Sequence, residues 1–259
     1  MPPANIKFTK SASNADTFVI NYYLEALDRS GNEYDDKFFN LNNTVNANYN
    51  YLTRAEDFFD ILGFTQYKAD PAFGNNGQLD ITGGGEVNLY YTRNVYELKF
   101  VSNGFPLDEY TRRLMYQQPI ESEYDLLPRD IPYPSNIEPG AVQFAGWYTS
   151  PSCADGTEFF FDGKTPMPLG GIVLYAKWED CSYTANIYFE PEMETLLGEP
   201  QTVIFDSFLQ EPDYKQKQQS DDNYKNLLFA GWYYKDGDSE VRFDFNTMTL
   251  KQDLDIYAK

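Results

Sequence analysis

Apolar and polar residues alternate with a period of two along several short stretches of the chain. In residues 95–101, Tyr96, Leu98 and Phe100 form the apolar set, and charged residues stand between them. Alternation of this kind, in segments rich in aromatic and β-branched residues, predicts half-buried β-strands. The same pattern occurs over residues 18–24, 87–91, 172–178, 183–189 and 254–258.

One stretch predicts a helix instead. Thr53-Arg54-Ala55-Glu56 has the form of a capping box, in which the threonine and glutamate side chains satisfy unpaired amides of the first turn. Apolar residues follow at helical spacing, and Gly63 is well placed to end the helix. Turns are predicted at Arg29–Asn32 and Gly83–Gly85. The order strand, strand, helix, strand predicts a small α+β module for the first 94 residues.

The rest of the chain contains an internal repeat. Phe144-Ala145-Gly146-Trp147-Tyr148 recurs letter for letter as Phe229-Ala230-Gly231-Trp232-Tyr233, 85 positions later. Tyr175-Ala176-Lys177 recurs as Tyr257-Ala258-Lys259, 82 positions later. Two ordered matches at a nearly constant offset indicate a duplicated unit. We therefore predict three modules, at residues 1–94, 95–180 and 181–259.

Composition excludes several kinds of function. The 259 residues carry a net charge of −20 and include two cysteines and no histidine. Without histidine there is no Ser-His-Asp or Cys-His catalytic system and no imidazole metal ligand, and two cysteines cannot build a four-sulfur zinc site. The negative charge repels phosphate backbones, so we expect no nucleic-acid partner. Aromatic residues make up 17% of the chain, which supplies enough apolar area for folding.

The repeated motifs resemble a known family. Phe-Ala-Gly-Trp-Tyr, followed by Tyr-Ala-Lys, is similar to the internalin-type B repeat, also called the Listeria–Bacteroides repeat, over residues 95–259. Residues 18–94 resemble more loosely the MucBP-like (mucin-binding-protein) repeats. The resemblance implies ubiquitin-like β-grasp modules in tandem on Gram-positive cell-surface proteins. The expected fold class is therefore α+β and β-rich, with three small β-grasp-like modules in an elongated array.

The Gly-Trp-Tyr motif has two readings. In a module of about 80 residues each core side chain must contribute much of the stability, and a tryptophan buries roughly 150–250 Å². Core packing of Trp147 and Trp232 is therefore the preferred reading, with an exposed sugar-stacking platform as the alternative. The preceding Gly146 and Gly231 are expected to let a neighbouring backbone approach closely.

The carboxylates raise the question of catalysis or metal binding. Two carboxylates suffice for glycoside hydrolysis, but 40 acidic residues bring pairs together by chance, so we expect no enzyme activity and no cofactor. Calcium is the alternative, with oxygen ligands from Asp236–Glu240 or Glu33–Asp36. Neither segment follows the twelve-residue loop pattern, and the first is equally a turn between strands. We therefore predict no catalytic, cofactor or metal site.

The two cysteines leave two possibilities open. A disulfide between Cys153 and Cys181 would close a loop of about 28 residues and add roughly 3 kcal/mol of stability. The other reading is two independent thiols, because the sequence does not place the α-carbons within bonding range.

These observations predict a non-catalytic region of a bacterial cell-surface protein. We expect a monomeric stalk or adhesion module that presents or contributes to binding of a host glycoprotein, a mucin or another extracellular ligand. The alternatives are a glycan- or mucin-binding module and an accessory region of a secreted carbohydrate-active enzyme. The junctions at Thr92–Asn94 and Glu179–Asp180 are short, which favours a semi-rigid array. The sequence has no membrane-spanning stretch, and we expect the signal peptide and wall anchor to lie outside it.

Overall fold

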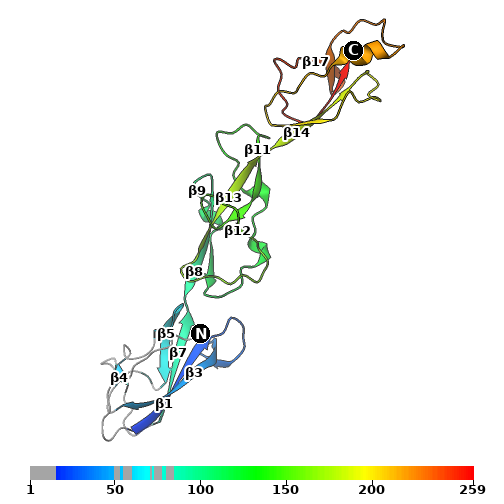
Figure 1. Ribbon diagram of the computed structural model, residues 1–259. Coiled ribbons are helices and arrows are strands. Elements are labelled where there is room, and N and C mark those ends of the chain that lie inside the picture. The colour runs from blue at the N-terminus through cyan, green and yellow to red at the C-terminus, as the bar shows by residue number, and fades with distance from the viewer. Residues whose placement is uncertain (1–15, 50–52, 55–59, 71, 73–77, 80–84) are drawn as a thin grey trace. The chain divides into compact units, whose positions relative to one another are not determined.

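The computed structural model describes residues 16–49, 53–54, 60–70, 72, 78–79 and 85–259. Over these residues the chain is rich in β-structure, with three large sheets and one short α-helix (Figure 1). By its internal contacts the chain divides into two compact units. The first comprises residues 1–126, 149–151 and 159–174, and the second comprises residues 127–148, 152–158 and 175–259.

The first sheet has the strand order β2-β3-β1-β7-β5. Its core strands β1 and β7 run parallel, with Ile20 beside Val87, and both residues are buried. The predicted strands at 18–24 and 87–91 are thereby confirmed. The strands are β1 (Asp16–Glu25), β2 (Asn32–Tyr34), β3 (Lys37–Tyr49), β5 (Phe64–Asp70) and β7 (Gly85–Arg93).

The predicted helix over residues 53–63 is tested only at its two ends, and its first residues are not helical. Thr53 and Arg54 form β4 (Thr53–Arg54), which pairs with β6 (Gln78–Leu79), and residues 60–63 form a turn. Gly63 has a φ of +83° and forms the turn that leads into β5. Residues 55–59 and the glycines at 83 and 84 lie outside the described residues.

The second sheet has the order β10-β8-β13-β11-β12, and β9 pairs with β8. Leu98, Phe100 and Leu174 are buried, as the alternation predicted. Its strands are β8 (Val95–Ser102), β9 (Phe105–Pro106), β10 (Arg112–Met115), β11 (Val142–Tyr148), β12 (Glu158–Phe159) and β13 (Ile172–Asp180). Three single turns of 3₁₀-helix lie between β9 and β11, at Asp108–Tyr110, Ser122–Tyr124 and Pro128–Asp130.

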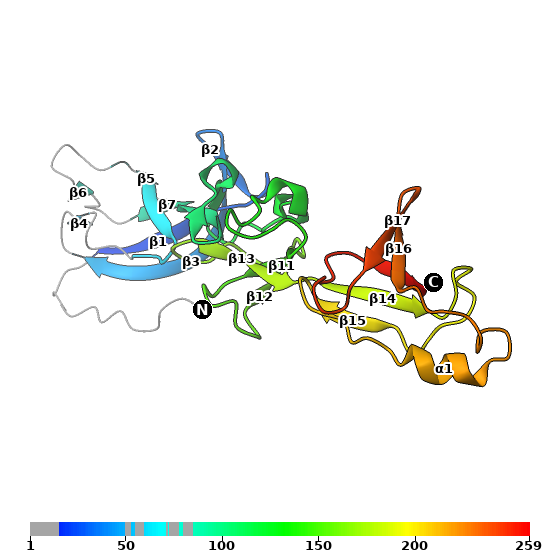
Figure 2. The ribbon, with the colours of Figure 1, turned by 90° about the horizontal axis from the view of Figure 1, so that it is seen from above.

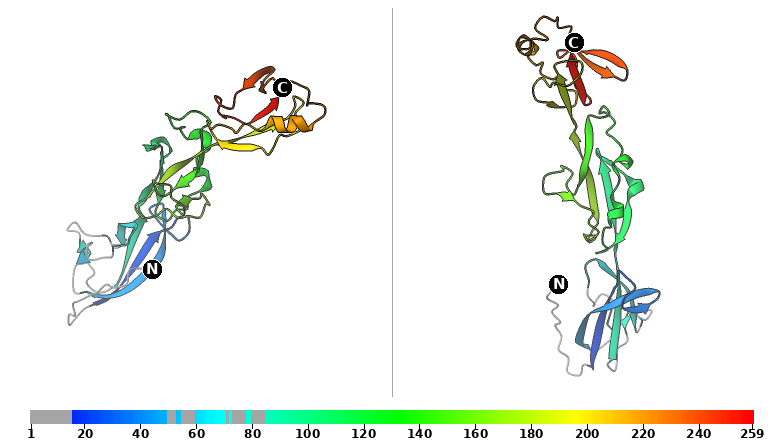
Figure 3. Two further views of the ribbon diagram at one scale, coloured as in Figure 1. Left: turned by 45° about the horizontal axis from the view of Figure 1, so that its top comes forward. Right: turned by 90° about the vertical axis from the view of Figure 1, so that its right-hand side faces the viewer.

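The third sheet has the order β15-β14-β18-β16-β17, with β14 and β18 parallel. The helix α1 (Tyr214–Ser220) lies between β15 and β16 in the chain (Figure 2). Its Tyr214 packs on Phe189 and Trp232. The hairpin of β16 and β17 completes this sheet (Figure 3). Its strands are β14 (Ser182–Tyr188), β15 (Gln201–Ile204), β16 (Trp232–Asp236), β17 (Ser239–Phe243) and β18 (Leu254–Ala258).

A single residue, Asn94, connects β7 of the first sheet to β8 of the second, and Arg93 fastens this junction. The Arg93 guanidinium donates from Nε to the backbone oxygen of Glu25 at 2.7 Å and from Nη1 to the backbone oxygen of Tyr116 at 2.9 Å. It also lies 4.8 Å from the ring centre of Phe64. Burial lowers the pKa of this guanidinium, although it stays charged at neutral pH.

The connection between β13 and β14 is equally short, because Cys181 alone separates them. Tyr183 donates from its hydroxyl to the backbone oxygen of Gly140 at 2.9 Å, and Lys251 forms an ion pair with Glu138 at 2.9 Å. Both contacts join the segment before β11 to the third sheet. Neither junction therefore contains free linker chain.

Candidate functional site

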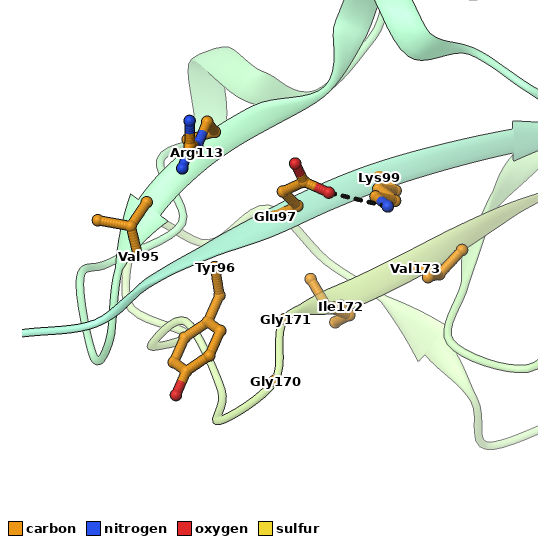
Figure 4. Close-up of a pocket in the computed structure, with 9 residues that line it drawn as sticks. All are labelled: Val95, Tyr96, Glu97, Lys99, Arg113, Gly170, Gly171, Ile172 and Val173. Carbon is orange, nitrogen blue, oxygen red and sulfur yellow. Dashed lines mark ion pairs between the residues drawn. The ribbon is translucent and has the colours of Figure 1, made fainter. Parts of the chain in front are cut away.

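An open hollow of about 350 Å³ lies beside β8 in the second sheet (Figure 4). Its volume is at the lower end of the range of small-molecule pockets. We call it the β8 groove, and it is lined by Val95, Tyr96, Glu97, Lys99, Arg113 and Gly170–Val173.

The strand geometry decides which side chains face the groove. Successive residues of β8 point to opposite sides of the sheet, so Glu97 and Lys99 share the exposed face. Arg113 lies directly opposite Glu97 in the antiparallel pairing of β10 with β8. Tyr96 points to the other side of the strand (Figure 4), where its ring meets Tyr116 edge-on. The exposed face of β8 in the groove therefore presents charged and aliphatic side chains, and the ring of Tyr96 lies on the opposite side of the strand.

The charges in the groove interact with one another. Lys99 Nζ lies 2.8 Å from a carboxylate oxygen of Glu97. The hydrogen bond from Lys99, with a weaker attraction from Arg113, lowers the pKa of Glu97, and the same bond raises the pKa of Lys99. Both side chains are about half exposed, so solvent weakens the pair. The lining carries one acid and two bases, a local excess of positive charge on an acidic chain.

Gly171 lets the loop before β13 approach the backbone of β8 at one end of the groove. It has a φ of +87°, and a Cβ atom placed on it would lie 2.6 Å from the backbone oxygen of Glu97. No other residue type fits both the conformation and the space. The backbone of the loop before β13 therefore lies directly against β8 at this point.

The third sheet carries different side chains at the corresponding position. The repeat offset aligns Gly171 with Asp253 and Val173 with Asp255. Asp253 accepts a hydrogen bond from the backbone amide of Thr184 at 2.7 Å, and Asp255 accepts one from the Asn186 side chain at 2.8 Å. Thr202 takes the place of Arg113 opposite Thr184. The third sheet thus replaces the basic lining with neutral and acidic groups that bind one another.

The preferred reading of the Gly-Trp-Tyr motif is confirmed. Trp147 is 3% exposed and Trp232 is 4% exposed. Trp232 packs edge-on against Phe229 and Phe245, and its Nε1 donates to Glu211 at 2.8 Å. Neither indole offers a face for stacking a sugar.

The expectation for the preceding glycines needs correction. Gly146 and Gly231 have φ values of +126° and +128°, and no backbone atom lies close to where a Cβ would be. The register of β11 against β13 shifts between Phe144 and Gly146, which makes Ala145 the extra residue of a β-bulge. Glycine is required here for a backbone conformation and not for a close approach of chains.

The acidic segments do not assemble a metal site. Among the residues that the structure describes, no group of three or more acidic or cysteine side chains is arranged to hold a metal ion. Asp236–Ser239 forms the turn between β16 and β17, the structural alternative given above. Glu240 pairs with Lys259 and accepts a hydrogen bond from Tyr257, while Asp35 pairs with Lys68. The carboxylates of Glu240 and Asp35 are therefore paired with lysines.

Cys153 and Cys181 are both free thiols in the structure. The Cys153 sulfur lies 3.9 Å from the backbone oxygen of Ala176, and burial raises the pKa of this thiol. Cys181 follows Ala176 by five residues of extended chain, which separates the two by about 16 Å at the rise of a β-strand. A disulfide needs α-carbons within about 7 Å, so this geometry favours the reading as independent thiols.

We expect thiol titration of the purified, unfolded chain to find two free cysteines, and reducing agent to leave the melting temperature unchanged. In the folded protein Cys153 should react slowly with maleimide at neutral pH, because the raised pKa reduces its thiolate fraction. Intact mass before and after alkylation counts the reactive thiols in the unfolded chain and in the folded protein. A mass 2 Da lower that reducing agent restores would show a disulfide instead.

Among the residues that the structure describes, no helix has the length and apolar character that crossing a bilayer requires. Residues 96–177 and 187–259 match the family model described as the Listeria-Bacteroides repeat domain. Two relatives come from Evansella cellulosilytica, and the chain spans about a quarter of the length of each. A protein whose name includes the words "Gly-rich membrane protein" is 27% identical over 88% of this chain and 24% of its own length. A second, whose name includes the words "membrane protein", is 28% identical over 64% of this chain and 21% of its own length.

Proposed function

Because the chain belongs to the Listeria-Bacteroides repeat family, we propose that it is a non-catalytic repeat region of a bacterial cell-surface protein, acting as a stalk and attachment module. The observation that carries the proposal is the pair of one-residue junctions. Asn94 and Cys181 alone separate consecutive sheets, and side-chain contacts fasten both places. A chain that only needed to connect independent binding units would not require such close coupling.

Burial of the repeated motif also supports the proposal. Both copies of the tryptophan are used for the core, so the sequence that defines the repeat serves folding. Side chains outside the motif are then free to differ between copies, as the β8 groove and its counterpart in the third sheet do. This division of roles suits a repeat region that spaces and presents other surfaces.

We extend the proposal to the modules themselves. We propose that the chain divides into three modules after residues 94 and 180 and that each module has a β-grasp-like fold. We propose also that the first module, residues 1–94, is MucBP-like. The sheet orders support it, since each sheet places its first and last long strands side by side, β1 with β7, β8 with β13 and β14 with β18. The end-to-end arrangement predicted from the short junctions is part of the same proposal, and small-angle scattering in solution tests it.

An accessible epitope tests the cellular location. The loop at Gly198 is exposed and has open space around it, so an inserted tag should leave the third sheet folded. We expect antibody to label intact, unpermeabilised cells that carry the tagged full-length gene, and external protease to remove the label. Labelling only after permeabilisation would contradict the proposal.

A further inference from the structure

Arg113 gives the β8 groove a cation that attracts Glu97 only weakly. Its side chain is exposed, and within the described part of the chain its guanidinium forms no ion pair or hydrogen bond. Basic residues are scarce in this protein, with 20 against 40 acidic ones. An unpaired guanidinium beside a hollow offers a planar set of donors that matches a carboxylate or sulfate.

The other residues that line the groove limit the kind of ligand that it can bind. Val95 and Val173 provide aliphatic surface, and Glu97 provides carboxylate oxygens that accept hydrogen bonds. A bare anion would be repelled by Glu97. A polyhydroxylated acid avoids this conflict, because its hydroxyls can donate to Glu97 while its anionic group binds Arg113 and its C–H face covers the valines.

The third sheet supplies an internal comparison. There the aligned residues are Thr184, Asn186, Thr202, Asp253 and Asp255, which carry two acids and no base. Both acids are engaged in hydrogen bonds to β14, and one of them, Asp253, stands where the second sheet has Gly171. The same scaffold thus carries acidic and neutral side chains in one copy and a mostly basic lining in the other.

We propose that the β8 groove binds an acidic saccharide, whose carboxylate or sulfate is held by Arg113 and Lys99 and whose hydroxyls are held by Glu97. The inference rests on the proposed function, since a cell-surface location brings such saccharides within reach. Binding at one groove is weak, because the anion meets a single unpaired cation on a chain of net charge −20. Useful affinity would come from the grooves of several neighbouring chains that bind one polysaccharide together.

Nuclear magnetic resonance titration of the full chain tests the proposal. The probes are trigalacturonate, a heparin-derived tetrasaccharide, neutral maltotriose and inorganic sulfate, and the reporters are the backbone amides of Gly170 and Gly171 in the groove. We expect shifts with one or both acidic saccharides and none with maltotriose. The two acidic probes distinguish a carboxylate from a sulfate ligand.

Three variants locate the site. Arg113→Gln should weaken binding about tenfold, the loss expected for one charge-assisted hydrogen bond. Val173→Asp, which copies Asp255 of the third sheet, should abolish binding by occupying Lys99. The control Arg129→Gln removes the same charge at a side chain that is 79% exposed outside the groove, and should bind within about twofold of the wild type.

The outcomes separate the two proposals. Equal binding by Arg113→Gln and the wild type, or equal shifts with maltotriose, would overturn the saccharide site. Shifts with inorganic sulfate but with neither acidic saccharide would also overturn it, and would leave the surface role to the epitope experiment. If saccharide binds but the epitope is not surface-exposed, the groove stands and the proposed function fails.

Discussion

Trp232→Ala is expected to lower the free energy of unfolding of the third sheet by about 3–5 kcal/mol. The indole is 4% exposed and touches Phe229, Phe245 and Tyr214, so its removal leaves a cavity among aromatic rings. These neighbours come from three different segments of the chain and cannot all collapse into the space. Hydrogen exchange followed by mass spectrometry of peptides from residues 182–259 measures the loss where it occurs.

Matched variants make this result interpretable. Trp147→Ala should destabilise peptides of β11 and β13 to a similar extent, because Trp147 holds the aligned position and is 3% exposed. Leu228→Ala is the control: its side chain is 94% exposed, and we expect a change within about 0.5 kcal/mol. A loss below about 1 kcal/mol at Trp232 would mean that the repeated motif is not the core of the module, and the proposed scaffold role would fail with it.

Strand positions were predictable because burial alternates directly with the sequence. Leu98 and Phe100 in β8, and Ala185 and Ile187 in β14, are buried as the pattern indicates. The reason for Gly146 and Gly231 was not predictable in the same way. A β-bulge depends on the register against another strand, here β13 for Gly146, and no local pattern contains that register.

Two segments with capping signals show the limits of such signals in the sequence. The capping box at Thr53 is present in the sequence, yet Arg54, which it places in the first turn, pairs with Gln78 as part of a strand. The observed helix α1 carries a similar signal, since Asp213 accepts a hydrogen bond from the amide of Gln216. Its short length and mostly polar sequence gave no apolar periodicity to accompany the cap.

The β8 groove was not found from the sequence, although one signal was available. Aligning the two copies at their Tyr-Ala-Lys motifs places Gly171 opposite Asp253 and Val173 opposite Asp255. That comparison reveals a difference in side-chain volume and charge at one place on a shared scaffold. What it cannot give is the position of Arg113, which reaches the groove only through the pairing of β10 with β8.

Arg93→Ala is the second large effect we expect, a loss of about 2–4 kcal/mol at the junction of the first and second sheets. The substitution removes donors to the backbone oxygens of Glu25 and Tyr116 and to the side chain of Gln117, and it exposes Phe64. Hydrogen exchange should rise in β7, β8 and the turn at Tyr116, while peptides of the third sheet keep their protection.

Arg93→Lys separates charge from geometry at this site. A lysine keeps the positive charge but cannot reach the oxygens of Glu25 and Tyr116 together, because its donors radiate from one nitrogen. We therefore expect it to recover less than half of the lost stability. Arg112→Ala is the control, since within the described residues its guanidinium donates only to the backbone oxygen of the adjacent Thr111. If Arg93→Lys matched the wild type, simple charge would hold the junction, and the close coupling that supports the stalk proposal would rest on the second junction alone.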